Sequence, residues 1–87
     1  MPIDRSPVIP RLVVQMRANN IGGTPNTQRT LREALGISQP RVSEILHIAI
    51  SRGLVAGSDR LYDGGRCYVL TPEGDRYAAE QMQGAGP

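Results

Sequence analysis

Residues 30–55, TLREALGISQPRVSEILHIAISRGLV, contain the pattern that decides the fold of this chain. Leu31 and Leu35 lie one helical turn apart, and Gly36 follows them at a position where a helix can end in a left-handed residue. Ser38 comes two residues later and is a favourable N-cap for a second helix. Two helices joined by a short turn that contains glycine form a helix-turn-helix, and the stretch therefore predicts this motif.

The second helix of the motif is expected to cover residues 39–52 and to bury one face, with Ile37 filling the gap between the two helices. Helical spacing predicts a buried stripe of Leu31, Ala34 and Leu35 on the first helix and Val42, Ile45, Leu46, Ala49 and Ile50 on the second. The side chains left on the outer face are Pro40, Arg41, Ser43, Glu44, His47, Ile48 and Ser51. A solvated face has a similar composition, so it is the position directly after the turn that singles this face out.

Further helices are predicted on both sides of the motif. Helical spacing of Ile9, Leu12, Val13 and Met16 predicts a first helix over residues 7–20, for which Ser6 is the expected N-cap. Asn26 and Thr27 are good N-caps for the helix that carries Leu31. Thr71 would cap a last helix over residues 72–82, with Pro72 in the first turn, where no N–H donor is needed.

The sequence after Gly53 changes from a helical to an extended pattern. Residues 54–56 predict a short apolar strand, and residues 60–62 and 66–70 predict a β-hairpin around Asp63-Gly64-Gly65. Asp-Gly favours a type I′ turn, because both central residues of that turn need a positive φ. We therefore expect one α+β domain over residues 1–87, a winged helix-turn-helix of about four helices and a small antiparallel β-hairpin wing. Its parts are the helix-turn-helix at 27–52, the wing at 54–70 and the last helix at 72–82.

The composition fits one small domain and excludes several classes of protein. The chain has 87 residues, 39% of them hydrophobic, and neither Trp nor Phe, which allows one modest aliphatic core. No apolar run approaches the roughly 20 residues that span a bilayer, and the first residues lack the apolar stretch of a secretory signal, so a cytoplasmic protein is expected. The net charge is +2, and all ten basic residues are arginine, which suits bidentate contacts with phosphates or guanine.

The sequence carries none of the common catalytic or cofactor-binding motifs. The chain contains no GxGxxG, no phosphate-binding loop of the Walker type and no HExxH, and its single His and single Cys do not make a Cys–His–Asn site. We therefore expect no enzyme, no bound metal and no cofactor. Cys67 is interpreted as a small, half-buried residue of a strand rather than a redox centre.

The motifs quoted above also carry a family resemblance. LREALGISQPRVSEIL is followed by RGLV, by the predicted hairpin and by YVLTPEGDRY. Residues 27–77 resemble the winged-helix domain of MarR-type bacterial regulators, in which LTPEG is typical after the return strand of the wing. The resemblance implies sequence-specific binding of double-stranded DNA and a role as a transcriptional repressor. MarR-type chains tend to be longer, so a small-molecule effector pocket is not expected here.

The resemblance also implies which residues would touch DNA. The residues expected to read bases from the major groove are Gln39, Pro40, Arg41, Ser43, Glu44 and His47. Those expected to hold phosphates are Thr27, Arg29, Ser38, Arg52, Arg60 and Arg66. The wing departs from the family pattern, because Asp59 and Asp63 balance its two arginines, whereas MarR-type wings tend to be strongly basic.

A homodimer is expected through the first and last helices. Val8, Val14 and Ile21 lie away from the predicted inner stripe of the first helix, and Tyr77, Ala78 and Met82 on the last helix would join them. Such pairing would set two recognition helices about one DNA turn apart and favour a palindromic site. A monomer that covers these residues itself is the alternative. For function, the alternative is a winged-helix protein–protein interaction module in a transcription, replication or segregation assembly, which the neutral wing and an outward-facing Ile48 favour.

Overall fold

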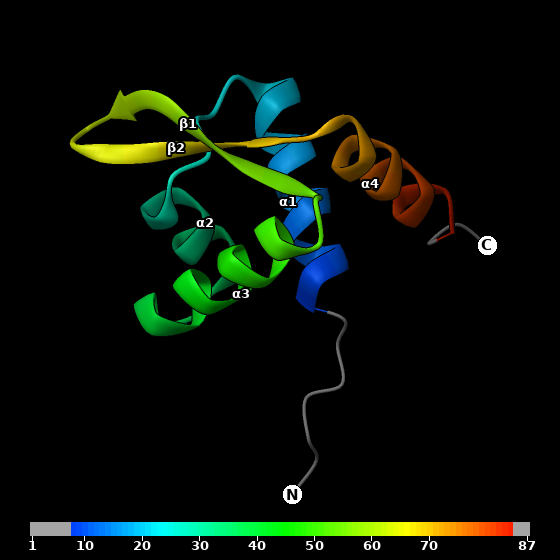
Figure 1. Cartoon of the computed structure of the whole chain (residues 1–87), viewed down its shortest axis with the longest axis horizontal. Coiled ribbons are helices and arrows are strands. Elements are labelled where there is room, and N and C mark those ends of the chain that lie inside the picture. Colours follow the sequence, from blue (N-terminus) through cyan, green and yellow to red (C-terminus); the bar gives the residue numbers. More distant parts are fainter. Residues whose placement is uncertain (1–7, 85–87) are drawn as a thin grey trace, which may run out of the picture.

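The computed structural model describes residues 8–84, and these residues form four helices and one two-stranded antiparallel sheet (Figure 1). Along the chain the elements are α1 (Val8–Gly22), α2 (Gln28–Leu35), α3 (Gln39–Ser51), β1 (Val55–Tyr62), β2 (Gly65–Leu70) and α4 (Pro72–Gly84). The predicted winged helix-turn-helix architecture is confirmed. Ser6, the expected N-cap of α1, lies outside the described residues. No helix within 8–84 is both long enough and apolar enough to cross a membrane.

The hydrophobic core lies around α1, which has α2 and α3 on one side and α4 on the other (Figure 1). The buried apolar side chains are Ile9, Leu12, Val13, Met16, Leu31, Val42, Ile45, Leu46, Ala49, Val55 and Ala78. All four residues predicted for the inner stripe of α1 are among them. Removal of this apolar surface from water is the main force that holds α3 and the hairpin against α1.

Three predictions about helix faces were wrong. Ala34 and Ile50 are exposed, the latter to 40%, whereas Ile48 is half-buried against the core. With about 100° between successive helix residues, Ile48 and Ile50 lie on opposite flanks of the buried stripe of α3, each about 100° from its centre. Helical spacing does not separate two such positions, so the packing of neighbouring elements decides which one is covered.

The predicted helix caps of the helix-turn-helix are present. The Thr27 side chain accepts a hydrogen bond from the Thr30 N–H at 3.1 Å, and Thr30 Oγ1 accepts one from the Thr27 N–H at 2.9 Å. Gly36 ends α2 with φ +68°, as expected for a left-handed cap. Ser38 Oγ accepts from the Arg41 N–H at 3.3 Å at the start of α3. Together these caps fix the angle at which α3 leaves α2.

Asn26, the other expected cap of α2, bonds to α1 instead of capping α2. Its side chain is buried and donates to the Met16 carbonyl at 3.3 Å and to Asn20 Oδ1 at 3.1 Å, while it accepts from Asn19 Nδ2 at 2.8 Å. Its carbonyl accepts from the Tyr68 N–H at 2.7 Å. Asn26 therefore joins the end of α1 to both α2 and the wing.

The wing differs from the prediction in its first strand. The expected short strand at 54–56 and the first arm of the hairpin are one strand, β1, whose pairing with β2 shifts between Gly57 and Leu61. Residues 58–60 of β1 lie opposite a single residue of β2, Cys67. Cys67 pairs with none of them and forms a β-bridge with Thr27. The predicted turn is confirmed: Asp63 and Gly64 have φ values of +52° and +79°, and Tyr62 pairs with Gly65.

The start of α4 is fastened to the turn that follows α3. Thr71 Oγ1 caps α4 by accepting from the Gly74 N–H at 3.0 Å, and it donates to the Gly53 carbonyl at 2.6 Å. The Thr71 N–H donates to the Leu54 carbonyl at 3.0 Å. Gly74 lies so close to this carbonyl that a Cβ on it would be 1.9 Å from the Leu54 oxygen. Glycine at this position therefore lets α4 approach the base of the wing.

Candidate nucleic-acid interface

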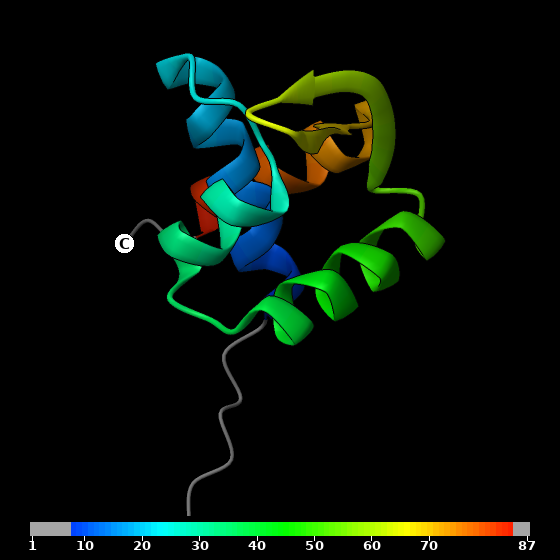
Figure 2. The same cartoon turned by 90° about the vertical axis from the view of Figure 1, so that its left-hand side faces the viewer.

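The outer face of α3 carries the residues that were predicted to read bases. Figure 2 shows α3 along one edge of the described fold, with the other elements on one side of it. The side chains of Gln39, Pro40, Arg41, Ser43, Glu44 and His47 are all exposed there. The opposite side of α3 supplies four buried core residues, so the helix cannot rotate without exposing them. The polar face is thus held outward by the core.

Arg41 and Glu44 form an ion pair on this face. Arg41 Nη1 and Glu44 Oε1 are 2.5 Å apart, and the two residues are three positions apart on the helix. Both side chains are about half exposed, so the pair contributes little to stability, on the order of a few tenths of a kcal/mol. Either partner can therefore exchange the other for a ligand at small cost.

Gln39, at the start of α3, belongs to a chain of hydrogen bonds that crosses three elements. Its Nε2 donates to Gln28 Oε1 on α2, and Gln28 Nε2 donates to the hydroxyl of Tyr68 on β2 at 3.4 Å. The three side chains line an open pocket of about 510 Å³ between the first turn of α2, the start of α3 and the tip of the hairpin. Sequence reasoning missed Gln28 and Tyr68, because neither helical nor strand spacing shows that they meet.

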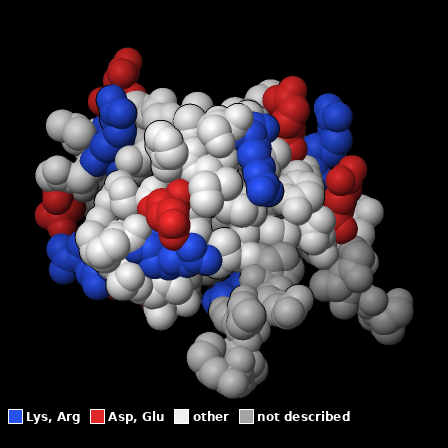
Figure 3. Space-filling model, turned by 60° about the horizontal axis from the view of Figure 1, so that its bottom comes forward, with Lys and Arg blue, Asp and Glu red and all other residues white. Residues whose placement is uncertain are grey.

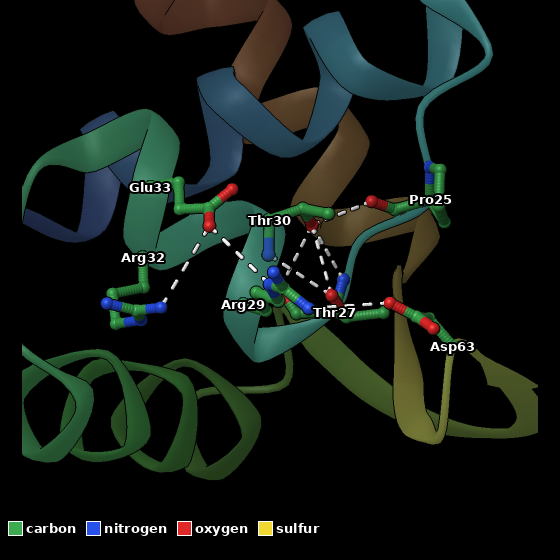
Figure 4. A network of polar contacts seen from close by, with 7 residues as sticks. All are labelled: Pro25, Thr27, Arg29, Thr30, Arg32, Glu33 and Asp63. Carbon is green, nitrogen blue, oxygen red and sulfur yellow. Dashed lines mark hydrogen bonds and ion pairs between the residues drawn. The ribbon is translucent and has the colours of Figure 1, made fainter.

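Thr27, predicted to hold a phosphate together with the N–H groups of its helix N-terminus, is the N-cap of α2. Thr27 is buried, and both its side chain and its N–H are engaged in the capping box with Thr30 (Figure 4). Neither group is free to meet a ligand. Ser38 is exposed at the N-terminus of α3, where backbone N–H groups favour an anion.

Arg29 links the first turn of α2 to the wing. Its guanidinium lies 3.5 Å from Glu33 on the same helix and 3.4 Å from Asp63 at the tip of the hairpin (Figure 4). Asp63 was predicted only as a turn residue, and the ion pair with Arg29 is an additional role. Because all three side chains are largely exposed, the contact is screened by water and salt.

The other arginines predicted to hold phosphates are exposed. Arg52 lies at the C-cap of α3, Arg60 in the irregular part of β1, and Arg66 on β2, where its side chain lies over Gly57. Acidic and basic side chains alternate on the face seen in Figure 3, without a continuous basic stripe. Between residues 27 and 66 there are six arginines and four carboxylates. The surface is therefore mildly rather than strongly positive.

Only some of the residues predicted for a dimer interface are exposed. Val8, Val14 and Tyr77 are half-buried and pack against the core of the same chain, and Ala78 is fully buried within it. Ile21 and Met82 are exposed, to 74% and 47%. Arg17 pairs with Asp75 at 3.0 Å, so the start of α4 lies beside the second half of α1, and Met82 lies two turns farther along α4. Much of the apolar surface expected for pairing is used inside the fold.

Cys67 and the acidic residues offer little chemistry of their own. Cys67 is half-buried on β2, as interpreted from the sequence. Within residues 8–84, no group of three or more His, Cys, Asp or Glu side chains is placed to hold a metal ion.

This arrangement of helices, turn and hairpin is a winged helix of the kind found in MarR-type regulators. Solved structures of three such proteins share it. Wild-type MarR from Escherichia coli matches 92% of this chain with a TM-score of 0.75 and 17% identity. AdcR, the adhesin competence repressor of Streptococcus pyogenes, matches 93% with a TM-score of 0.74 and 18% identity. A mutant of MepR from Staphylococcus aureus, bound to an oligodeoxyribonucleotide, matches 92% with a TM-score of 0.76 and 20% identity.

These similarities are similarities of fold. This chain spans 57% of the length of each of the three matched chains. No protein-family model matches the sequence, and no curated protein matches it either.

Proposed function

We propose that this protein binds double-stranded DNA through the outer face of α3 and acts as a transcriptional repressor by occupying a promoter. The observation that carries the proposal is the exposed polar face of α3, held outward directly after a capped helix-turn-helix turn. Its fold is shared with a MepR mutant solved with an oligodeoxyribonucleotide, which supports the proposal. A helix in this position fits the major groove, whose base edges carry a distinct pattern of donors and acceptors.

The proposal assigns base contacts to α3 and backbone contacts to its surroundings. Arg41 suits a bidentate contact with guanine and Glu44 an acceptor contact with cytosine, once their ion pair opens. The face is completed by Gln39, Pro40, Ser43 and His47. The phosphate contacts are assigned to Arg29, Ser38, Arg52, Arg60, Arg66 and the N–H groups at the N-terminus of α2, which Thr27 caps.

The proposal includes a homodimer that binds a palindromic site. The exposed side chains of Ile21 on α1 and Met82 on α4 support an apolar contact with a second copy. Two recognition helices about 34 Å apart would then meet successive major grooves on one side of the duplex.

Two single variants test the division between base and phosphate contacts. Arg41→Ala should relax the preference at one base pair, at a cost of about 1–3 kcal/mol if the contact is bidentate. Arg60→Ala should weaken the binding of all duplexes alike and make the plot of log K against log salt less steep by about 0.9. The measurement is a binding isotherm on a panel of duplexes selected from random DNA. Equal effects of the two variants across the panel would contradict the assignment.

A protein-interaction module is the second candidate, and one observation favours it. Leu61 and Tyr62 at the tip of the wing are 73% and 53% exposed, on a hairpin whose acidic and basic residues balance. Large exposed apolar side chains often mark a contact with another protein. Absence of any duplex affinity at about 50 mM salt would favour this candidate over DNA binding, because sequence-independent binding is strongest at low salt.

A further inference from the structure

The hydrogen bonds that Gln39 makes in the free protein restrict how its side chain can meet a base. A carboxamide has two N–H bonds and one carbonyl oxygen. One N–H of Gln39 is donated to Gln28 Oε1. In a bidentate contact with adenine, a glutamine uses its carbonyl oxygen and the N–H on the same side of the amide. The bond to Gln28 restricts the rotation of the Gln39 amide, and the adenine-binding edge is free when the bonded N–H is the one on the opposite side.

Tyr68 binds the nitrogen end of the Gln28 amide. Gln28 Nε2 donates to the Tyr68 hydroxyl at 3.4 Å, so the oxygen of the same amide is directed at α3. Tyr68 is itself fixed, because it is half-buried against the core and its N–H donates to the Asn26 carbonyl at 2.7 Å. A reversed Gln28 amide would present its oxygen to the Tyr68 hydroxyl and its N–H groups to Gln39, so the bond that Gln39 donates would be lost.

From this chain of contacts we infer that Gln28 and Tyr68 are positioning residues that orient Gln39 to read adenine. Gln39 lies at the edge of an open pocket of about 510 Å³, so a base pair can approach it. A glutamine that is held before binding loses less side-chain freedom when it binds, and the gain appears only when the matching base is present. The inference rests on the proposed function and adds the source of selectivity at one base pair.

The test compares base preferences of whole-chain variants on the duplex that wild-type protein selects from random DNA. Gln39→Ala first locates the base pair that Gln39 reads. At that base pair we expect wild type to prefer adenine over the other bases by about tenfold to a hundredfold. Gln28→Met keeps the length of the side chain but removes the acceptor, and it should reduce this preference at least threefold with all other positions unchanged. Tyr68→Phe should reduce it at the same base pair.

Two further variants separate orientation from damage to the fold. Gln28→Glu retains an acceptor for Gln39 and adds a negative charge, so it should weaken all duplexes while the adenine preference remains. Gln83→Met, an exposed glutamine on α4, is the matched control and should leave the profile unchanged. The inference is overturned if Gln28→Met retains the wild-type adenine preference, or if it reduces the base preference equally at every position of the duplex. It is also overturned if Gln28→Glu loses the adenine preference, or if the base pair located by Gln39→Ala is not an adenine pair. If wild-type protein binds no duplex, the proposed function is overturned as well. If wild-type protein binds selectively and Gln28→Met keeps the same adenine preference, only this inference is overturned.

Discussion

Replacement of Gly74 by alanine should destabilise the fold, although alanine is the better helix former. Gly74 lies in the first turn of α4, where a Cβ would be 1.9 Å from the Leu54 carbonyl oxygen and 2.8 Å from its carbon. Real Cβ contacts are essentially never under 3.0 Å, so the two backbones would have to separate by about 1 Å. Neither neighbour is the flexible end of a side chain. The Leu54 carbonyl also accepts the Thr71 N–H, and this bond would be strained or lost.

The opposing contributions differ enough to decide the sign. Alanine in place of glycine in a helix gains at most about 1 kcal/mol. The steric conflict costs about 1–3 kcal/mol, and an unsatisfied carbonyl costs about 1–3 kcal/mol more. The expected net loss is about 1–5 kcal/mol, with a central value of about 3 kcal/mol. For a domain of this size, the central value corresponds to a fall in Tm of about 12–24 °C.

Urea and thermal unfolding followed by circular dichroism measure this loss. Gly22→Ala is the matched control, because Gly22 is the last residue of α1 and a Cβ there meets nothing within 4 Å. The control should be neutral or more stable by up to about 1 kcal/mol. Equal stability of Gly74→Ala and wild type would refute the argument that close approach of α4 to Leu54 requires glycine.

Three other variants test separate parts of the structure. Asn26→Ala should lower the free energy of unfolding by about 2–3 kcal/mol, measured by urea titration, because it leaves buried partners on α1 without hydrogen bonds. Asp63→Ala should be about 1 kcal/mol less stable than Asp63→Gly in the same titration, since only glycine relieves the positive φ of +52°. Glu44→Gln should raise affinity for random duplex about two- to fivefold, measured at low salt, because it removes a negative charge from the proposed DNA-binding face. An unchanged affinity would contradict the placement of this face against DNA.

The parts of the fold that were predictable depend on local signals. Thr27 and Gly36 fulfil their predicted roles at the ends of α2, Ser38 begins α3, and Asp63 makes the turn of the hairpin. Each of these residues acts within about four positions of itself along the chain, where sequence spacing is a direct guide to geometry. The same holds for the polar face of α3, which is the complement of a buried stripe.

The parts that were missed depend on contacts between distant segments. Asn26 looks like a helix cap in the sequence, but its role is set by α1 on one side and by β2 on the other. In the sequence, Gly74 is part of the LTPEG motif within the last predicted helix, and only the position of Leu54 shows why no side chain fits there. The bond between Gln28 and Tyr68 joins residues 40 positions apart. Spacing along one element carries no information about such pairs.

The distribution of ion pairs is consistent with the proposed sequence-selective binding of DNA. Arg29 and Arg41 each lie beside a carboxylate, whereas Arg52, Arg60 and Arg66 pair with no carboxylate among residues 8–84. In the proposed complex, contact with any duplex would begin at Arg52, Arg60 and Arg66, since no ion pair has to be broken there. Contact through Arg41 would require exchange of Glu44 for a base edge, which is favourable where guanine presents two acceptors in the right geometry. Under this proposal the carboxylates would reduce the affinity for arbitrary DNA more than for a matching site, and specificity is the difference between the two affinities.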